Sequence, residues 1–168
     1  KKYKLRLSAA AEKCLADETP KELHNVHTQI IGSVRQLCKA AYKACKELGY
    51  EPRILAEDVT AEAREVGWNL AQLCLREHAG EKKMALIAGG ETVVHLRGKG
   101  KGGRNQELAF SAMKVIAGQK DIAIFSVGSD GTDGPTDAAG GYVDGDSYEA
   151  LKNAGLSYEK ILQDNDCY

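Results

Sequence analysis

The sequence predicts an α/β fold, with three α/β/α layers around a mostly parallel, partly mixed sheet. Short apolar runs alternate with helical patterns of 12 or more residues along the 168-residue chain. Helices of this length provide the crossovers that parallel strands require. Two glycine-rich loops follow such runs, at the strand ends where open α/β sheets bind their ligands.

The first elements are a helix, a β-branched run and a second helix. An alanine-rich helix is expected at residues 8–18, with Ser8 as its N-terminal cap. The β-branched run at 26–31 predicts a short strand. A helix is expected at 34–48, because its pattern stops at Gly49, and glycine favours the position just past a helix C-terminus.

A strand, a helix and a broken apolar run follow. The segment 52–56 is a candidate strand, and a long helical pattern covers 61–79. The continuous apolar run at 84–88 is typical of a fully buried strand. Two glycines and Glu91 interrupt it. The alternating segment 92–96 is then expected to form a second strand, which adds a hairpin to the otherwise parallel sheet.

The remaining elements continue the alternation. A helix is expected at 104–117 and an apolar strand at 122–127. A short strand at 140–143 and two short helices, at 147–153 and 157–163, end the chain.

Composition excludes several classes of protein. The net charge of −1 provides no basic field that would recruit nucleic acid. No apolar run approaches the roughly 20 residues that a membrane span requires. The five cysteines are scattered and contain no C-x-x-C pair, which favours a reducing, cytoplasmic setting.

The first glycine-rich loop, residues 98–103, carries cations. It satisfies the pattern G-x-G-x-x-G between an expected strand and an expected helix. Lys99 and Lys101 lie inside the pattern and Arg104 opens the helix, where backbone N–H groups and a planar guanidinium suit a phosphate or carboxylate. A solvated β–α connection, with Arg104 paired to Glu107, is the alternative interpretation.

The second loop, residues 128–137, carries carboxylates. Asp130, Asp133 and Asp137 are of the type that a magnesium ion or a substrate hydroxyl needs. Aspartate in such a turn more often bonds its own backbone, and only Asp130, nearest the strand end, is the preferred catalytic candidate. Glu91 also follows a strand, and we predict that the three loops converge on one cleft.

Three motifs occur in a fixed order: residues 89–92 (GGET), 97–107 (RGKGKGGRNQE) and 129–140 (SDGTDGPTDAAG). Together they closely resemble the MOFRL-type, or class II, glycerate 2-kinases, some of which carry the name hydroxypyruvate reductase. The resemblance implies a two-domain enzyme that transfers the γ-phosphoryl group of ATP to D-glycerate, with Mg²⁺, in a cleft between its domains. It implies that residues 1–24 are a helical linker from a missing N-terminal domain. Residues 25–168 would be the C-terminal α/β domain, truncated at its C-terminus, and inactive as an isolated fragment.

The resemblance also implies the site residues. Glu91, Arg104 and Asp130 would lie in the catalytic cleft, with Asp130 or Glu91 reaching Mg²⁺. A lysine and an aspartate of the N-terminal domain would complete the site. The residues expected to bind substrate or phosphate are Gly89, Gly90, Lys99, Lys101, Gly102, Gly103, Asn105, Gln106 and Asp133.

Two other functions stay open. The G-x-G-x-x-G loop would bind the cofactor of an NAD(P)-dependent hydroxypyruvate reductase, although its lysines and the missing second βαβ half count against this. A non-catalytic ligand-binding module of the same fold is the other alternative. The expected partners are a small-molecule substrate and the N-terminal domain, without nucleic acid or membrane.

Overall fold

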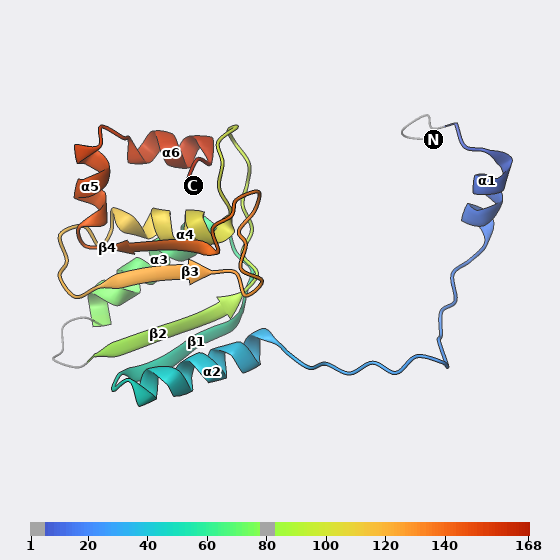
Figure 1. Ribbon diagram of the computed structural model, residues 1–168, viewed down its shortest axis with the longest axis horizontal. Coiled ribbons are helices and arrows are strands. Elements are labelled where there is room, and N and C mark those ends of the chain that lie inside the picture. Colours follow the sequence, from blue (N-terminus) through green and yellow to red (C-terminus); the bar gives the residue numbers. More distant parts are fainter. Residues whose placement is uncertain (1–5, 78–82) are drawn as a thin grey trace. The chain divides into compact units, whose positions relative to one another are not determined.

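The computed structural model describes residues 6–77 and 83–168 (Figure 1). The chain divides into two compact units, the first ending at Ile31 and the second beginning at Gly32. The domain boundary expected after residue 24 stays a prediction, because a compact unit does not by itself define a folded domain.

The first unit holds one short helix. α1 spans Ala9–Ala16, and the hydroxyl of Ser8 accepts a hydrogen bond from the N–H of Ala11 at 3.3 Å, which confirms the expected cap. The strand expected at 26–31 is wrong, because these residues are exposed and have no regular secondary structure. A β-branched run forms a strand only where another strand pairs with it, and none of the described residues does so.

The second unit begins with helix α2, Val34–Glu47, which packs against the first two strands. The hydroxyl of Ser33 accepts a hydrogen bond from the N–H of Gln36 at 3.3 Å. Gly49 follows the helix with φ +82°, a conformation that favours glycine. The helix expected at 34–48 is therefore confirmed, together with its predicted end before Gly49.

The strands form one parallel and one antiparallel pair. β1, Glu51–Val59, pairs in parallel with β2, Met84–Gly90, and α3, Ala63–Glu77, connects them. β3, Ala123–Val127, pairs antiparallel with β4, Gly140–Asp144. The α/β prediction is confirmed, and the strand arrangement is mixed.

Helices lie on both sides of the strands. In Figure 1, α2 lies on one side, whereas α4, Arg104–Met113, and α6, Tyr158–Asp164, lie on the other. α5, Ser147–Asn153, precedes α6. α4 contacts α3, β3 and β4 and ends earlier than predicted, and the expected end of α3 at 78–79 lies outside the described residues. The buried core consists of Ala71, Phe110, Ala112, Met113, Ile116, Ile122, Ile124 and Val143.

The hairpin expected after Glu91 is wrong. Segment 92–96 forms no strand, and Val93 makes only an isolated bridge. The N–H of Glu91 donates to the carbonyl of Val59 at 2.8 Å, so the chain continues alongside the end of β1 instead of turning back onto β2. The run at 84–88 is also less buried than predicted, because β1 is its one strand partner among the described residues.

Helices α3 and α4 approach closely at Gly67. A Cβ atom there would lie 2.0 Å from the carbonyl oxygen of Leu108 and 2.2 Å from Oγ of Ser111. Both distances are far inside van der Waals contact, so this packing requires glycine. Because α4 begins with Arg104, the same contact helps to place that residue.

We expect Gly67→Ala to destabilise the protein by about 1–3 kcal/mol, because the clash with α4 outweighs the roughly 1 kcal/mol that alanine gains over glycine within a helix. Urea unfolding followed by circular dichroism measures this free energy. Gly32→Ala is the control, since nothing lies within 4 Å of a Cβ atom built there. Equal stability of the two variants would contradict the close approach of α3 and α4.

Candidate active site

The two glycine-rich loops meet at the start of α4. Asp133, in the loop between β3 and β4, is 2% exposed. Its Oδ1 accepts hydrogen bonds from the backbone N–H and Nδ2 of Asn105, both at 3.0 Å, and its Oδ2 accepts one from the N–H of Gln106 at 2.8 Å. A Cβ atom at Gly103 would lie 2.3 Å from Cγ of Asp133. Asp133 therefore caps α4 and requires glycine before Arg104.

Asn105 and Gln106 turn into the protein. Oδ1 of Asn105 accepts a hydrogen bond from the hydroxyl of Ser126 at 2.6 Å, and Nε2 of Gln106 donates to Oγ1 of Thr136 at 2.7 Å. Both side chains are buried. This geometry indicates that the two side chains stabilise the packing of α4 against β3 and the loop after it. Their expected contact with a substrate stays a prediction.

Gly89 and Gly90 bring Glu91 to the end of β2. A Cβ atom at Gly89 would lie 2.6 Å from Sγ of Cys38, and one at Gly90 would lie 2.2 Å from the carbonyl oxygen of Val59. Gly90 also has φ +156°. Both glycines therefore serve close packing around the strand end, which delivers Glu91 to the surface.

Glu91 and Arg104 form an ion pair open to solvent. Nη1 of Arg104 donates to Oε1 of Glu91 at 2.8 Å, and the two side chains are 42% and 76% exposed. Two predicted catalytic residues are thus brought together. The alternative pairing of Arg104 with Glu107 is wrong, because Arg64 takes that carboxylate.

Asp130 takes part in a local turn. It is exposed, and its Oδ1 accepts a hydrogen bond from the N–H of Thr132 at 3.3 Å, which is the local turn bond common for aspartate. Among the described residues it makes no hydrogen bond or ion pair with Glu91 or Arg104. Its catalytic role stays a prediction.

Lys99 and Lys101 differ in their surroundings. Both are exposed, but Nζ of Lys101 lies 4.0 Å from the ring centroid of Tyr168. The hydroxyl of Tyr168 in turn donates to Asp137, and this hydrogen bond lowers the pKa of the Asp137 carboxyl. Lys99 is therefore the less engaged of the two lysines.

The backbone amides in the first half of the cationic loop are hydrogen-bonded within the protein. The N–H groups of residues 97–101 donate to residues 164–166, and two of the acceptors are the carboxylates of Asp164 and Asp166. These five amides are therefore not available to an anion, and of the predicted anion-binding amides of 102–105, that of Asn105 already donates to Asp133. Among the described residues, only the amides of 102–104 make no hydrogen bond in this part of the loop.

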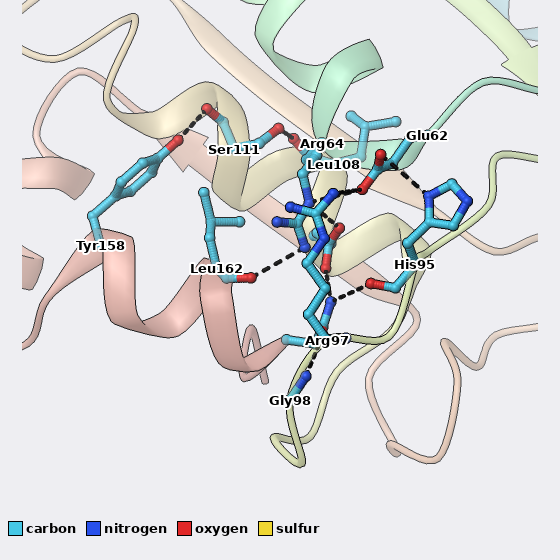
Figure 2. Close-up of polar contacts among 11 residues, drawn as sticks. Glu62, Arg64, His95, Arg97, Gly98, Leu108, Ser111, Tyr158 and Leu162 are labelled. Atoms are coloured by element: carbon cyan, nitrogen blue, oxygen red, sulfur yellow. Dashed lines mark hydrogen bonds and ion pairs between the residues drawn. The ribbon is translucent and has the colours of Figure 1, made fainter.

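A network of ion pairs adjoins α4, with Glu107, Arg64 and Glu62 largely buried and His95 and Arg97 exposed (Figure 2). Glu107 is 2% exposed, and its Oε1 lies 2.9 Å from Nε of Arg64. The same Nε lies 3.2 Å from Glu62, which also contacts His95 at 3.2 Å and Arg97 at 3.4 Å. This network was not predicted from the sequence. A glutamate such as Glu107, within a helix that is otherwise buried, indicates that a positively charged partner is buried beside it. The sequence does not identify that partner.

Within residues 6–77 and 83–168, no group of three or more His, Cys, Asp or Glu side chains is placed to hold a metal ion. None of the described helices is long and apolar enough to cross a membrane. All five cysteines are free thiols.

Comparison with known proteins gives consistent matches. Residues 84–168 match the MOFRL family. The chain is 43% identical to the D-glycerate 2-kinase of Thermotoga maritima over 99% of its length, and 39% identical to the glycerate 2-kinase of Pyrococcus horikoshii over 90%. It is 40% identical to the glycerate kinase of Danio rerio over 74% of its length.

Two crystal structures have the same fold. The TM-score is 0.83 for the glycerate kinase from T. maritima, at 43% identity over 99% of this chain, and 0.75 for a protein from P. horikoshii, at 38% identity over 94%. The chain spans 41% and 37% of these two structures, and 41%, 36% and 27% of the three curated relatives.

We expect Asp133→Asn to lower the free energy of unfolding by about 1–3 kcal/mol. The asparagine side chain keeps only one acceptor oxygen, so its NH2 group would face a buried backbone N–H at the start of α4 that has lost its acceptor. Urea unfolding measures the loss. Asp130→Asn is the matched control from the same loop, and an exposed site of this kind changes stability by less than about 0.5 kcal/mol. Similar values for the two variants would disprove the cap.

Proposed function

This chain belongs to the MOFRL family, and from that premise we propose that it supplies the C-terminal half of an interdomain active site that phosphorylates D-glycerate with ATP. The names of the relatives from T. maritima and P. horikoshii support the reaction. The observation that carries the proposal is the Glu91–Arg104 ion pair, open to solvent at the capped start of α4. A lysine and an aspartate of the N-terminal domain complete the site.

Arg104 binds the anionic group of a substrate. Its guanidinium gives one N–H to Glu91 and keeps others for bidentate contact with a carboxylate or phosphate. Because an exposed ion pair contributes only about 0–1 kcal/mol, an arriving anion readily displaces Glu91. Glu91 then accepts a hydrogen bond from the substrate hydroxyl and takes its proton as the phosphoryl group is transferred.

The anion site depends on side chains more than on the helix end. Asp133 already places a negative charge at the N-terminus of α4, which weakens that end as a phosphate site. The side chains of Arg104 and Lys99 and the amides of 102–104 remain for the substrate. We therefore assign Asp133 to positioning Arg104.

Mg²⁺ accompanies ATP in this proposal. One or two carboxylates with phosphate oxygens and water usually hold it, so it needs no cluster of three protein ligands. Asp130, which is exposed, would hold it more readily than Glu91, which is paired with Arg104. The ion would neutralise charge on the phosphates.

The free cysteines support a reducing, cytoplasmic setting.

The nicotinamide alternative finds little support in the glycine loop. A Cβ atom at Gly98 would lie 2.1 Å from Oδ1 of Asp164, and one at Gly100 would lie 2.4 Å from Cβ of Asp166. These glycines face acidic residues of the same chain, which would repel a pyrophosphate. Their spacing serves internal packing.

Arg104→Ala in the full-length enzyme is expected to lower kcat/KM for D-glycerate by about a hundredfold or more, because the charged clamp on the substrate is lost. A coupled assay of ADP release measures it. Arg53→Ala is the matched control, because Arg53 forms a similar exposed pair with Glu77 at 3.0 Å, away from the site.

A kcat/KM within about threefold of the parent for Arg104→Ala would remove the clamp role. Oxidation of NADH by the full-length protein with hydroxypyruvate, without phosphorylation of glycerate, would replace the proposed reaction with the reductase alternative.

A further inference from the structure

Asn165 uses its whole side chain to join two elements. It lies just past α6 with φ +56° and is 5% exposed. Its Oδ1 accepts hydrogen bonds from the N–H groups of Arg97 at 2.7 Å and Gly98 at 3.2 Å. Its Nδ2 donates to Oε2 of Glu107 at 2.8 Å and to the carbonyl of His95 at 3.3 Å. Both lone pairs and both protons of the amide are thus engaged.

The neighbours of Asn165 extend this contact along the loop. Asp164 accepts from the N–H of Lys99 at 2.9 Å through its side chain and from the N–H of Gly100 at 2.8 Å through its carbonyl. Asp166 accepts from the N–H of Lys101 at 2.8 Å. Residues 164–166 thereby bind five consecutive loop amides, and we call this segment the clasp.

The clasp is also tied to the helix that carries Arg104. Glu107, which receives Nδ2 of Asn165, lies one turn after Arg104 on α4. Arg64 bonds that carboxylate at 2.9 Å, and its Nη2 donates to the carbonyl of Leu162 on α6 at 3.1 Å (Figure 2). Loop, α4 and α6 therefore share one buried polar junction, in which low dielectric strengthens each bond.

We propose that Asn165 is a positioning residue for the anion site: it sets the cationic loop in register with the start of α4, so that Lys99 and Arg104 converge on the same anionic substrate. This inference rests on the proposed function for its substrate. It predicts an effect on substrate binding, beyond any effect on stability, when the junction is disturbed.

The chemistry of position 165 gives a selective test. In Asn165→Asp the loop amides keep their acceptor, but Nδ2 becomes an oxygen against the carboxylate of Glu107. Two carboxyl groups in contact share a proton, so the pKa of the new group is raised. The protonated form restores the donor at low pH, and the ionised form loses it as pH rises. The charged and titratable groups facing the position are Glu107, Arg64, His95, Arg97, Asp164, Asp166 and Cys167.

Steady-state kinetics of full-length Asn165→Asp are to be compared with the parent at about pH 5.5 and about pH 8. At the higher pH we expect the KM of the variant for D-glycerate or ATP to be about tenfold above that of the parent. At the lower pH its KM should lie within about threefold of the parent value, and kcat should change less than KM at both pH values. KM reports only folded molecules, so lost stability alone does not move it. Tyr158→Phe is the control, because it removes another α6–α4 bond, to Ser111 at 2.7 Å, without touching the loop.

Asn165→Gly provides a measurement that needs no activity. Glycine accepts the left-handed backbone of position 165, so the variant removes only the side chain. We expect hydrogen exchange of the amides of residues 97–101 to accelerate about tenfold, with α2 unchanged. Unchanged exchange there, or KM values equal to the parent at both pH values for Asn165→Asp, would overturn the proposal. A parent enzyme inactive on glycerate would instead reject the proposed function, and the exchange result would still stand.

Discussion

The carboxylate of Asp133 at the N-terminus of α4 is the interaction on which the candidate site depends. It satisfies two backbone amides that a helix start leaves unpaired, and it attaches the loop after β3 to the loop before α4. Gly103 is glycine because this carboxylate occupies the space of its side chain. Arg104 is consequently the first residue of a rigid helix, with its backbone defined by buried groups and its guanidinium outside them.

Two Arg–Glu pairs of α4 contrast in their surroundings. Glu107 and Arg64 meet inside the protein, where an unpaired charge would be strongly unfavourable, so each requires the other. Glu91 and Arg104 meet at the surface, where water competes for both and the pair contributes little. The inner pair therefore suits a structural junction, and the outer pair suits exchange with a substrate.

The glycine-rich loop shows how one sequence pattern serves two physical demands. The alternation of glycine in residues 98–103 matches a phosphate-binding fingerprint, yet Gly98 and Gly100 lie against Asp164 and Asp166. Their lack of a side chain lets the clasp approach the loop backbone closely enough to bond it. The two lysines next to these glycines, Lys99 and Lys101, are exposed. The pattern is a packing requirement that leaves cations at the surface.

Within the described residues, the sequence by itself determined the α/β class and the approximate positions of six helices and four strands, because these follow from local periodicity and from terminal signals such as Ser8 and Gly49. It also placed Glu91 and Arg104 at adjoining element ends. Only the tertiary structure decided that 26–31 and 92–96 form no strands, since pairing depends on a neighbour that local sequence does not specify. The partners of Asp133, Glu107 and Asn165 were likewise beyond prediction, because these buried side chains bond residues between 27 and 70 positions away.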